Sequence, residues 1–297
     1  MTLESRPDSL IIIGSGAIGC EFAYYFNEFG TQVHLIEMMD HILPNEDSEI
    51  STEVEKSFKR SGIKISKGIK VSKIESLKTK VKVHTNNSKA KLIESELALL
   101  AIGVTGNIEN IGLEDIGVAV DAGSITINEF NQTSIPNIYA IGDVTGPPWL
   151  AHVASAQGHV AAEHAAGQKA VPVDYNNIPS CTYCQPQVAS IGLTESMAKE
   201  KGHEVKIGKF DFRASGKAMA TGNIDGFVKL VFDNKYGELL GAHIIGYEAT
   251  EMIAELGLAK ALEATWNELA TTVHAHPTLS EAVMEAALDA MGQGVHQ

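Results

Sequence analysis

The fold is decided by residues 10–19, which read LIIIGSGAIG. Residues 10–13 are a continuous run of branched apolar side chains, which is typical of a strand buried on both faces. Beyond the glycines, residues 20–29 carry apolar side chains at helical spacing and end at Gly30, which predicts a helix with a glycine C-cap. Because a second strand is predicted at residues 33–37, the whole stretch forms a strand–helix–strand unit.

The glycines of this stretch have the GxGxxG spacing of a dinucleotide-binding turn, in the strand-to-helix context that the motif requires. Gly14 permits the tight turn, Gly16 lets the backbone approach a pyrophosphate, and Gly19 lets helix and strand pack closely. Glu37, at the end of the second strand, would accept hydrogen bonds from ribose hydroxyls and repel a 2′-phosphate, which favours NAD over NADP. The alternative is a glycine turn that only packs. The predicted NAD contacts are Gly14, Ser15, Gly16, Ala17, Ile18, Gly19 and Glu37.

The rest of the chain divides by its hydrophobic pattern. Helices are predicted at 46–61, 151–166, 249–263 and 278–291, a fully buried strand at 97–102, and further strands at 63–65, 69–71, 81–84, 137–141, 190–192, 206–210, 226–233 and 239–245. We therefore expect an α/β, Rossmann-like NAD-binding domain over residues 1–103, a central segment over 104–172, and an α+β C-terminal domain over 173–297.

Composition narrows the classes of partner and location. The 297 residues are 44% hydrophobic and 20% charged, as in an ordinary globular chain of about two domains. A net charge of −14 repels phosphate backbones, so nucleic acid is not expected as a partner. No apolar run reaches the roughly 18–20 residues of a membrane span. The polar N-terminus does not suggest a signal peptide, and three cysteines suit a reducing, cytoplasmic location.

A candidate acid–base residue, His276, lies in residues 274–281, which read HAHPTLSE. Histidine titrates near neutrality and can accept and return a proton when a carboxylate such as Glu281 orients it. The same run also has the pattern of a capping box, in which Glu281 bonds back to Thr278 and His276 is an ordinary surface residue. The spacing alone leaves both interpretations open.

Two further features allow a functional and a structural interpretation. Asp143 follows the predicted strand 137–141 and could bind a ligand hydroxyl at the sheet edge, or cap a turn. Cys181 and Cys184 form a CxxC pair, which could serve thiol redox chemistry or half a metal site. Because this segment is predicted to be extended, the two thiols should point to opposite faces. No second pair completes a metal site, so we expect packing cysteines.

Taken together, these residues resemble the pyridine nucleotide-disulfide oxidoreductase family, most specifically over residues 10–23, 135–152 and 273–287. The HAHPTLSE run is more similar to the members that oxidise dihydrolipoamide than to glutathione reductase, whose equivalent run lacks the first histidine. The resemblance implies oxidation of dihydrolipoamide by NAD through FAD and a redox disulfide. It also implies a homodimer that binds the lipoyl-bearing acyltransferase of a 2-oxo acid dehydrogenase complex.

The resemblance assigns roles to particular residues. His276 would take the proton from the dithiol at the partner subunit's flavin, and Glu281 would orient it. Asp143 would bind the flavin ribityl chain, and Glu21 would lie close to the flavin. The further contacts implied are backbone contacts of Val71 and Gly103 to the nicotinamide nucleotide, and the passage of Trp149, Leu150, Ala151 and His152 beside the isoalloxazine.

The chain departs from the family pattern in two places. Residues 103–107 read GVTGN where members usually have a turn like Gly-Arg-Arg-Pro-Asn. Members also begin with an FAD-binding unit and a Cys-x4-Cys pair, neither of which is found here. We therefore expect the C-terminal part of such an enzyme, inactive alone. The alternatives are a flavin-free NAD-binding and dimerisation module, or another member such as glutathione reductase, which Glu37 disfavours.

Overall fold

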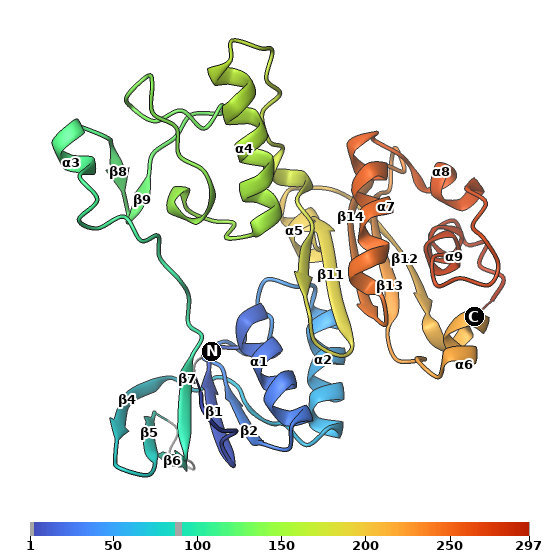
Figure 1. The fold of residues 1–297 in the computed structure, drawn as a ribbon. Helices are drawn as coiled ribbons and strands as arrows, with labels where there is room; N and C mark the ends of the chain where they lie inside the picture. The colour runs from blue at the N-terminus through green and yellow to red at the C-terminus, as the bar shows by residue number, and fades with distance from the viewer. Residues whose placement is uncertain (1–2, 87–90, 297) are drawn as a thin grey trace. The chain divides into compact units, whose positions relative to one another are not determined.

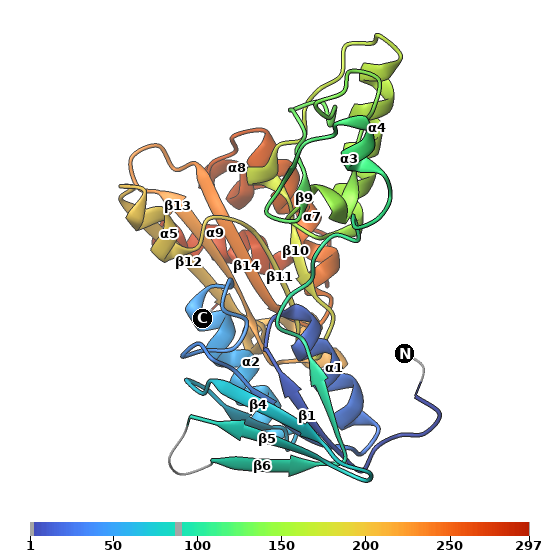
Figure 2. The same cartoon turned by 90° about the vertical axis from the view of Figure 1, so that its left-hand side faces the viewer.

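The computed structural model describes residues 3–86 and 91–296, drawn in Figures 1 and 2. The chain forms two compact units. The first unit joins the residues up to Ile102 with those from Pro179 onward, and the second unit is Gly103–Ile178. The first unit therefore combines the predicted nucleotide-binding region with the C-terminal region.

The nucleotide-binding region is built on a parallel sheet. Its strands β1 (Ser9–Ile13), β2 (Gln32–Ile36), β3 (Lys64–Ser66) and β7 (Leu97–Leu100) lie in the order β3-β2-β1-β7. Figure 1 shows helices α1 (Ala17–Glu28) and α2 (Ser48–Arg60) on one side of this sheet. The antiparallel strands β4 (Val71–Ser76), β5 (Val81–Thr85) and β6 (Leu92–Ser95) lie on the other. The predicted Rossmann-like unit is confirmed.

Strand β1 shows why a continuous apolar run was needed. Leu10 and Ile12 pack in the cluster that contains the buried residues of α1 and α2, whereas Ile11 and Ile13 pack against β4 and β5 residues. Successive strand residues point to opposite faces, so a strand covered on both faces must be apolar at every position. The prediction that residues 97–102 form a fully buried strand is wrong, because β7 is an edge strand and Leu100 is exposed.

The C-terminal region is an antiparallel sheet covered by helices. Strands β10 (Ser180–Thr182), β11 (Gln187–Gly192), β12 (Val205–Asp211), β13 (Phe227–Asp233) and β14 (Leu239–Gly246) have the order β10-β11-β14-β13-β12. Helices α7 (Ala249–Ala261) and α9 (Glu281–Ala290) pack on one face (Figure 1), and α8 (Trp266–Thr271) packs against α9. The shorter elements are α5 (Glu195–Glu200), η3 (Phe212–Ala214) and α6 (Gly216–Thr221). The predicted α+β region is confirmed.

The other face of this sheet packs on the layer of α1 and α2. Val188, Phe227 and Ile245 belong to the same buried cluster as Cys20 of α1 and Phe58 of α2. Since both helices thus lie between two sheets, the two regions of the first unit share one core.

A row of polar residues crosses that face of the sheet. Ser190, His243, Lys229 and Lys209 are paired neighbours on β11, β14, β13 and β12, so they point to the same side. The Lys229 side chain is 1% exposed and donates hydrogen bonds to Asp47, Glu49 and Glu195. Burial alone would lower the pKa of Lys229, but these three carboxylates hold it well above its usual value. A buried ion cluster therefore joins the start of α2 to the sheet.

The second unit has little regular sheet. It contains α3 (Leu113–Ile116), the hairpin β8 (Val120–Asp121) and β9 (Ser124–Ile125), η1 (Gly142–Thr145), α4 (Ala151–Ala165) and η2 (Tyr175–Asn177). The predicted helix at 151–166 is confirmed. The predicted strand at 137–141 is wrong, because only Tyr139 makes a bridge, to Gln132. An apolar run without a neighbouring strand to hydrogen-bond cannot form a ladder.

No helix in the described part of the chain combines the length and apolar character needed to cross a membrane.

Candidate functional site

The glycine turn between β1 and α1 combines close packing with an open front. Gly14 has φ +97°, and a Cβ there would collide with the carbonyl of Ala101. A Cβ on Gly19 would collide with the carbonyl of Gly14, so helix and strand touch at this point. Gly16 differs, because a Cβ there would meet nothing within 4 Å. No side chain in the described part of the chain caps the start of α1, so its first N–H groups are available to an anion in front of Gly16.

The Glu37 side chain is hydrogen-bonded to this turn. Its Oε2 accepts hydrogen bonds from Ser15 N at 2.8 Å and Ser15 Oγ at 2.7 Å, and its Oε1 accepts one from Met39 N at 2.8 Å. Burial raises the pKa of Glu37, but the hydrogen bonds from Met39 and Ser15 outweigh burial and lower it. An ionised carboxylate is therefore held against the turn, where it would repel the 2′-phosphate that distinguishes NADP from NAD.

The remaining predicted nucleotide contacts lie on α1, on β4 and at the first residue of the second unit. Ala17 and Ile18 are the first residues of α1, and the Ile18 side chain is exposed. Val71 is the first residue of β4 and is half-buried. Gly103 opens the second unit with φ +135°, a conformation that glycine adopts easily.

The predicted flavin contacts gather at one end of the second unit. Asp143 lies in η1, which packs against the start of α4. Within the described residues, no hydrogen bond or ion pair uses the Asp143 carboxylate, so it is available to ligand hydroxyls. Trp149 is exposed, Leu150 is the N-cap of α4, and no side chain caps this helix. The other two predicted contacts, Ala151 and His152, are exposed residues of its first turn.

Gln157 holds the Asp143 turn in place. It is buried on α4, and its Oε1 accepts a hydrogen bond from Gly142 N at 2.6 Å. Its Nε2 donates to Thr145 Oγ1 at 3.3 Å and to Tyr175 Oη at 2.8 Å. The one amide therefore binds both ends of η1. Sequence reasoning missed it, because an alanine-rich helix gives no sign of which polar residue points inward.

The structure brings His276 and Glu281 together. The Nδ1 of His276 is 2.9 Å from Oε1 of Glu281, and the imidazole is 79% exposed. Burial raises the pKa of Glu281, but hydrogen bonds from Thr278 N and His276 outweigh burial and lower it. An ionised carboxylate only accepts hydrogen bonds, so Nδ1 donates and Nε2 of the neutral ring is left with its lone pair. The pair has the arrangement of a general base with its orienting group.

The capping interpretation is half correct. Oε2 of Glu281 accepts a hydrogen bond from Thr278 N at 2.8 Å, while Oε1 serves His276. The hydroxyl of Thr278 donates to Ala275 O at 2.7 Å and, within the described residues, accepts no hydrogen bond from a helix N–H, so the reciprocal bond of a capping box is absent. Helix α9 consequently begins at Glu281, and the predicted start at residue 278 is wrong.

A second histidine–carboxylate pair was missed. The Nε2 of His274 is 2.8 Å from Oε1 of Glu255 on α7, and its side chain is 7% exposed. The two residues are 19 positions apart and lie on different elements, so no local spacing could signal the contact.

The cysteines occupy apolar surroundings, as expected. Cys181 packs against the cluster beneath α7 and α9, and Cys184 lies in the cluster of α1 and α2. Burial raises the pKa of Cys184 to about 12 and also raises that of Cys181, which suppresses thiolate chemistry. Among the described residues, no group of three or more His, Cys, Asp or Glu side chains could hold a metal ion.

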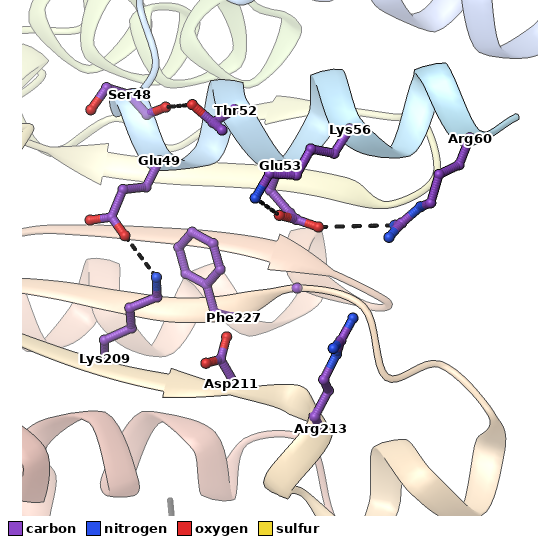
Figure 3. Close-up of a pocket in the computed structure, with 11 residues that line it drawn as sticks. Ser48, Glu49, Thr52, Glu53, Lys56, Arg60, Lys209, Asp211, Arg213 and Phe227 are labelled. Carbon is purple, nitrogen blue, oxygen red and sulfur yellow. Dashed lines mark hydrogen bonds and ion pairs between the residues drawn. The ribbon is translucent and has the colours of Figure 1, made fainter. Parts of the chain in front are cut away.

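A cavity of about 470 Å³ lies elsewhere, between α2 and strands β12 and β13 (Figure 3). Glu49 pairs with Lys209 at 2.7 Å, and Glu53 with Arg60 at 3.9 Å, across or along its wall. None of the predicted site residues lines it. Five of its charged side chains pair with one another, namely Glu49, Glu53, Lys56, Arg60 and Lys209, and we assign the cavity to the packing of α2 on the sheet.

Known proteins are similar to this chain over nearly its whole length. The model of the family "Pyridine nucleotide-disulphide oxidoreductase" matches residues 1–158, and that of its dimerisation domain matches 178–287. Similar relatives are the dihydrolipoyl dehydrogenases of Rhizobium etli and Bacillus subtilis. The Rhizobium etli protein is 46% identical over 98% of this chain, which covers 61% of that protein. The Bacillus subtilis protein is 47% identical over 100% of this chain, which covers 63% of that protein. The chain therefore spans about three fifths of the length of these relatives.

Solved structures show the same fold. LpdA from Mycobacterium tuberculosis has a TM-score of 0.88 at 30% identity, over 96% of this chain and 62% of that chain. The HOCl-induced flavoprotein disulfide reductase RclA from Escherichia coli has a TM-score of 0.88 at 26% identity, over 95% of this chain and 65% of that chain.

Proposed function

Because this chain belongs to the pyridine nucleotide-disulphide oxidoreductase family, we propose that it forms the NAD-binding and interface part of a dihydrolipoyl dehydrogenase. The reaction oxidises dihydrolipoamide with NAD⁺ to give lipoamide, NADH and a proton. The observation that carries the proposal is the exposed His276, whose Nδ1 is bound to Glu281 and whose Nε2 has no hydrogen-bond partner among the described residues. The division into residues 1–103, 104–172 and 173–297 belongs to the same proposal.

The chain's own chemistry in this reaction is proton handling. Nε2 of His276 takes a proton from the dithiol, and the Glu281 carboxylate stabilises the imidazolium that forms. The imidazolium then releases this proton, which is the H⁺ of the overall reaction. No side chain needs to move, since Glu281 is also fixed by Thr278 N.

The nucleotide site follows from the glycine turn. The N–H groups at the start of α1 would bind the pyrophosphate, and Gly16 leaves room for it. Glu37 would exchange its bond to the Ser15 hydroxyl for ribose hydroxyls and exclude a 2′-phosphate. Val71 and Gly103 would complete the contacts to NAD.

The second unit fits a flavin. FAD, when bound, carries the electrons between the dithiol–disulfide and the nicotinamide. The free carboxylate of Asp143 suits the hydroxyls of its ribityl chain, and the uncapped start of α4 suits an acceptor oxygen of its ring. Trp149 and Leu150 would flank the ring.

The interface region would form a homodimer. His276 is exposed in the single chain, so a subunit facing it would enclose the proton transfer. The dimerisation-domain match over residues 178–287 supports this assignment. The lipoyl-bearing acyltransferase of a 2-oxo acid dehydrogenase complex is the proposed partner.

The test has two steps. Calorimetry on this chain should show tighter binding of NADH than of NADPH, and equal or reversed affinities would contradict the role of Glu37. The complete enzyme is this chain with the FAD-binding part that carries the redox disulfide, and it should reduce NAD⁺ with dihydrolipoamide. Reduction of glutathione disulfide by NADPH instead would identify another family activity. Colourless, dimeric protein that binds NADH without turnover would indicate a flavin-free module.

A further inference from the structure

The loop that carries His276 has little contact with the rest of the molecule. It connects α8 to α9, and α7 lies beside both helices (Figure 1). Every residue from Thr271 to Pro277 is exposed except His274. Val273 is among the most exposed apolar residues described. Apolar burial therefore contributes little to holding the loop, and polar contacts must fix its shape.

Most of those polar contacts are local. At the start of the loop, Thr272 N and Oγ1 both donate to Glu268 O of α8, at 3.0 and 2.7 Å. At its end, Thr278 binds Ala275 O and Glu281 of α9. Such bonds tie the loop to its own flanking helices and by themselves would not anchor its middle.

His274 ties the middle of the loop to a third element. Its Nδ1 is 3.1 Å from Thr272 O, and its Nε2 is 2.8 Å from Oε1 of Glu255 on α7. Helix α7 packs on β11 and β14, the inner strands of the sheet. Glu255 therefore anchors the loop to the rigid core of the first unit.

The bond between His274 and Glu255 also affects the pair of His276 and Glu281. The hydrogen bond between Glu281 and His276 connects that carboxylate to the same loop. His276 is only two residues further along the loop. Releasing His274 would therefore disturb both the ring of His276 and the carboxylate that orients it.

We propose that Glu255 is a positioning residue for proton transfer. By holding His274 against α7, it fixes the loop so that Nδ1 of His276 faces Glu281 and Nε2 faces outward. This inference rests on the proposed role of His276. It assigns to Glu255 no contact with substrate or cofactor.

A purely structural role makes a different prediction. If the bond between His274 and Glu255 only stabilised the fold, removing it would lower the melting temperature and leave the His276 ring as it is. If Glu255 positions the loop, the His276 ring must change state even in a folded chain. The tautomer of His276 therefore separates the two roles.

The test measures the ring nitrogens of His276 by ¹⁵N NMR in the 297-residue chain. The unchanged chain should show the Nδ1–H tautomer, with Nε2 unprotonated in the neutral ring. In Glu255→Ala, His276 should lose its preference for the Nδ1–H tautomer and show the mixture of two tautomers that a free imidazole has. Glu255→Gln should restore much of it, because an amide oxygen still accepts from His274 Nε2.

The matched control is Glu251→Ala. Glu251 is exposed one turn earlier on α7, and in the described part of the chain its carboxylate makes no hydrogen bond or ion pair. It should leave the His276 signals unchanged. Should Glu255→Ala fail to fold, His274→Leu removes the same bond from the exposed loop and should cause the same loss. Unchanged His276 signals in the folded variants would overturn the proposal.

Turnover distinguishes this proposal from the one on which it rests. In the complete enzyme, Glu255→Ala should lower kcat by about 10- to 100-fold, as expected for a displaced catalytic group, and leave the KM for NAD⁺ unchanged. If His276→Gln is inactive while Glu255→Ala changes neither tautomer nor kcat, only the positioning role fails. If His276→Gln is fully active, the proposed function fails whatever Glu255 does.

Discussion

Two histidines that lie two residues apart in the sequence each bond to a carboxylate, but they differ in exposure and in the number of their partners. His274 is 2.8 Å from Glu255, and His276 is 2.9 Å from Glu281. The first imidazole is covered and has an acceptor oxygen at hydrogen-bond distance from each nitrogen, whereas the second is open and, among the described residues, has such a partner only at Nδ1. A hydrogen-bonded carboxylate therefore does not by itself make a histidine a proton carrier. We propose that a proton carrier also needs a free nitrogen on a loop that is held in place, as at His276.

A third pair sharpens the comparison. His296 is exposed, and its Nδ1 is 2.7 Å from Glu285 near the middle of α9. It has the same bond and a similar exposure to His276, but no anchored loop around it. It is therefore the natural control for every substitution at the His276 pair.

The largest expected effect comes from Glu281→Gln. The amide still accepts from Thr278 N, but it no longer stabilises an imidazolium, so turnover in the complete enzyme should fall by roughly 10²–10⁴. Steady-state lipoamide oxidation measures it. Glu285→Gln, at the control pair, should keep turnover within about twofold. Equal losses in both variants would abolish the distinction between the pairs.

Covered and open groups differ among the carboxylates as well, as the pKa values of Glu46 and Glu281 show. Burial raises the pKa of Glu46 from 4.5 to about 7, whereas that of Glu281 is lowered. Folded Glu46 thus binds more protons than the unfolded chain between pH 4.5 and about 7, so its contribution to stability is lost as pH rises through about 7. Glu46→Gln should stabilise the chain at pH 8 by about 1–3 kcal/mol and have little effect at pH 4.

Urea unfolding at both pH values measures this difference. Glu281→Gln provides the opposite sign, because a lowered pKa contributes stability above about 4.5 that is lost as pH falls. Glu46→Gln that is equally stabilising at both pH values would contradict the burial of a protonated carboxyl.

His274→Leu should also lower stability, by about 1–3 kcal/mol, because Glu255 loses its partner beside α7. Chemical denaturation measures this loss, and His296→Gln is its control. A stability change confined to within about 0.5 kcal/mol would show that the covered pair does not anchor the loop.

The smallest effect is expected at His296→Gln itself. An exposed ion pair contributes on the order of 0–1 kcal/mol, and no mechanism assigns this histidine a proton. Both the melting temperature and lipoamide turnover should stay close to those of the unchanged chain. A large loss of turnover would mean that exposure and a carboxylate suffice.

Local patterns predicted the nucleotide-binding turn well. The apolar run of β1, the three glycines and Glu37 lie within 28 consecutive residues, from Leu10 to Glu37, and their steric demands are readable one by one. His276 and Glu281 were also found, because five residues separate them. Strand 137–141 was wrong, because strand formation depends on a neighbour that the run itself does not contain.

Contacts between distant segments were not predictable. Lys229 and Asp47 are 182 residues apart, and a lysine within a strand ordinarily suggests an exposed face. The bond between Glu255 and His274 joins two elements whose packing is set by the whole C-terminal sheet. In each case the partner was decided by tertiary packing.

The most direct measurement is lipoamide turnover of the complete enzyme carrying His276→Gln, beside His296→Gln, at equal flavin content. If His276 transfers the proton, the first variant should lose roughly 10²–10⁴ in kcat, and the second should match the unchanged enzyme. Equal turnover in the two variants would contradict proton transfer by His276.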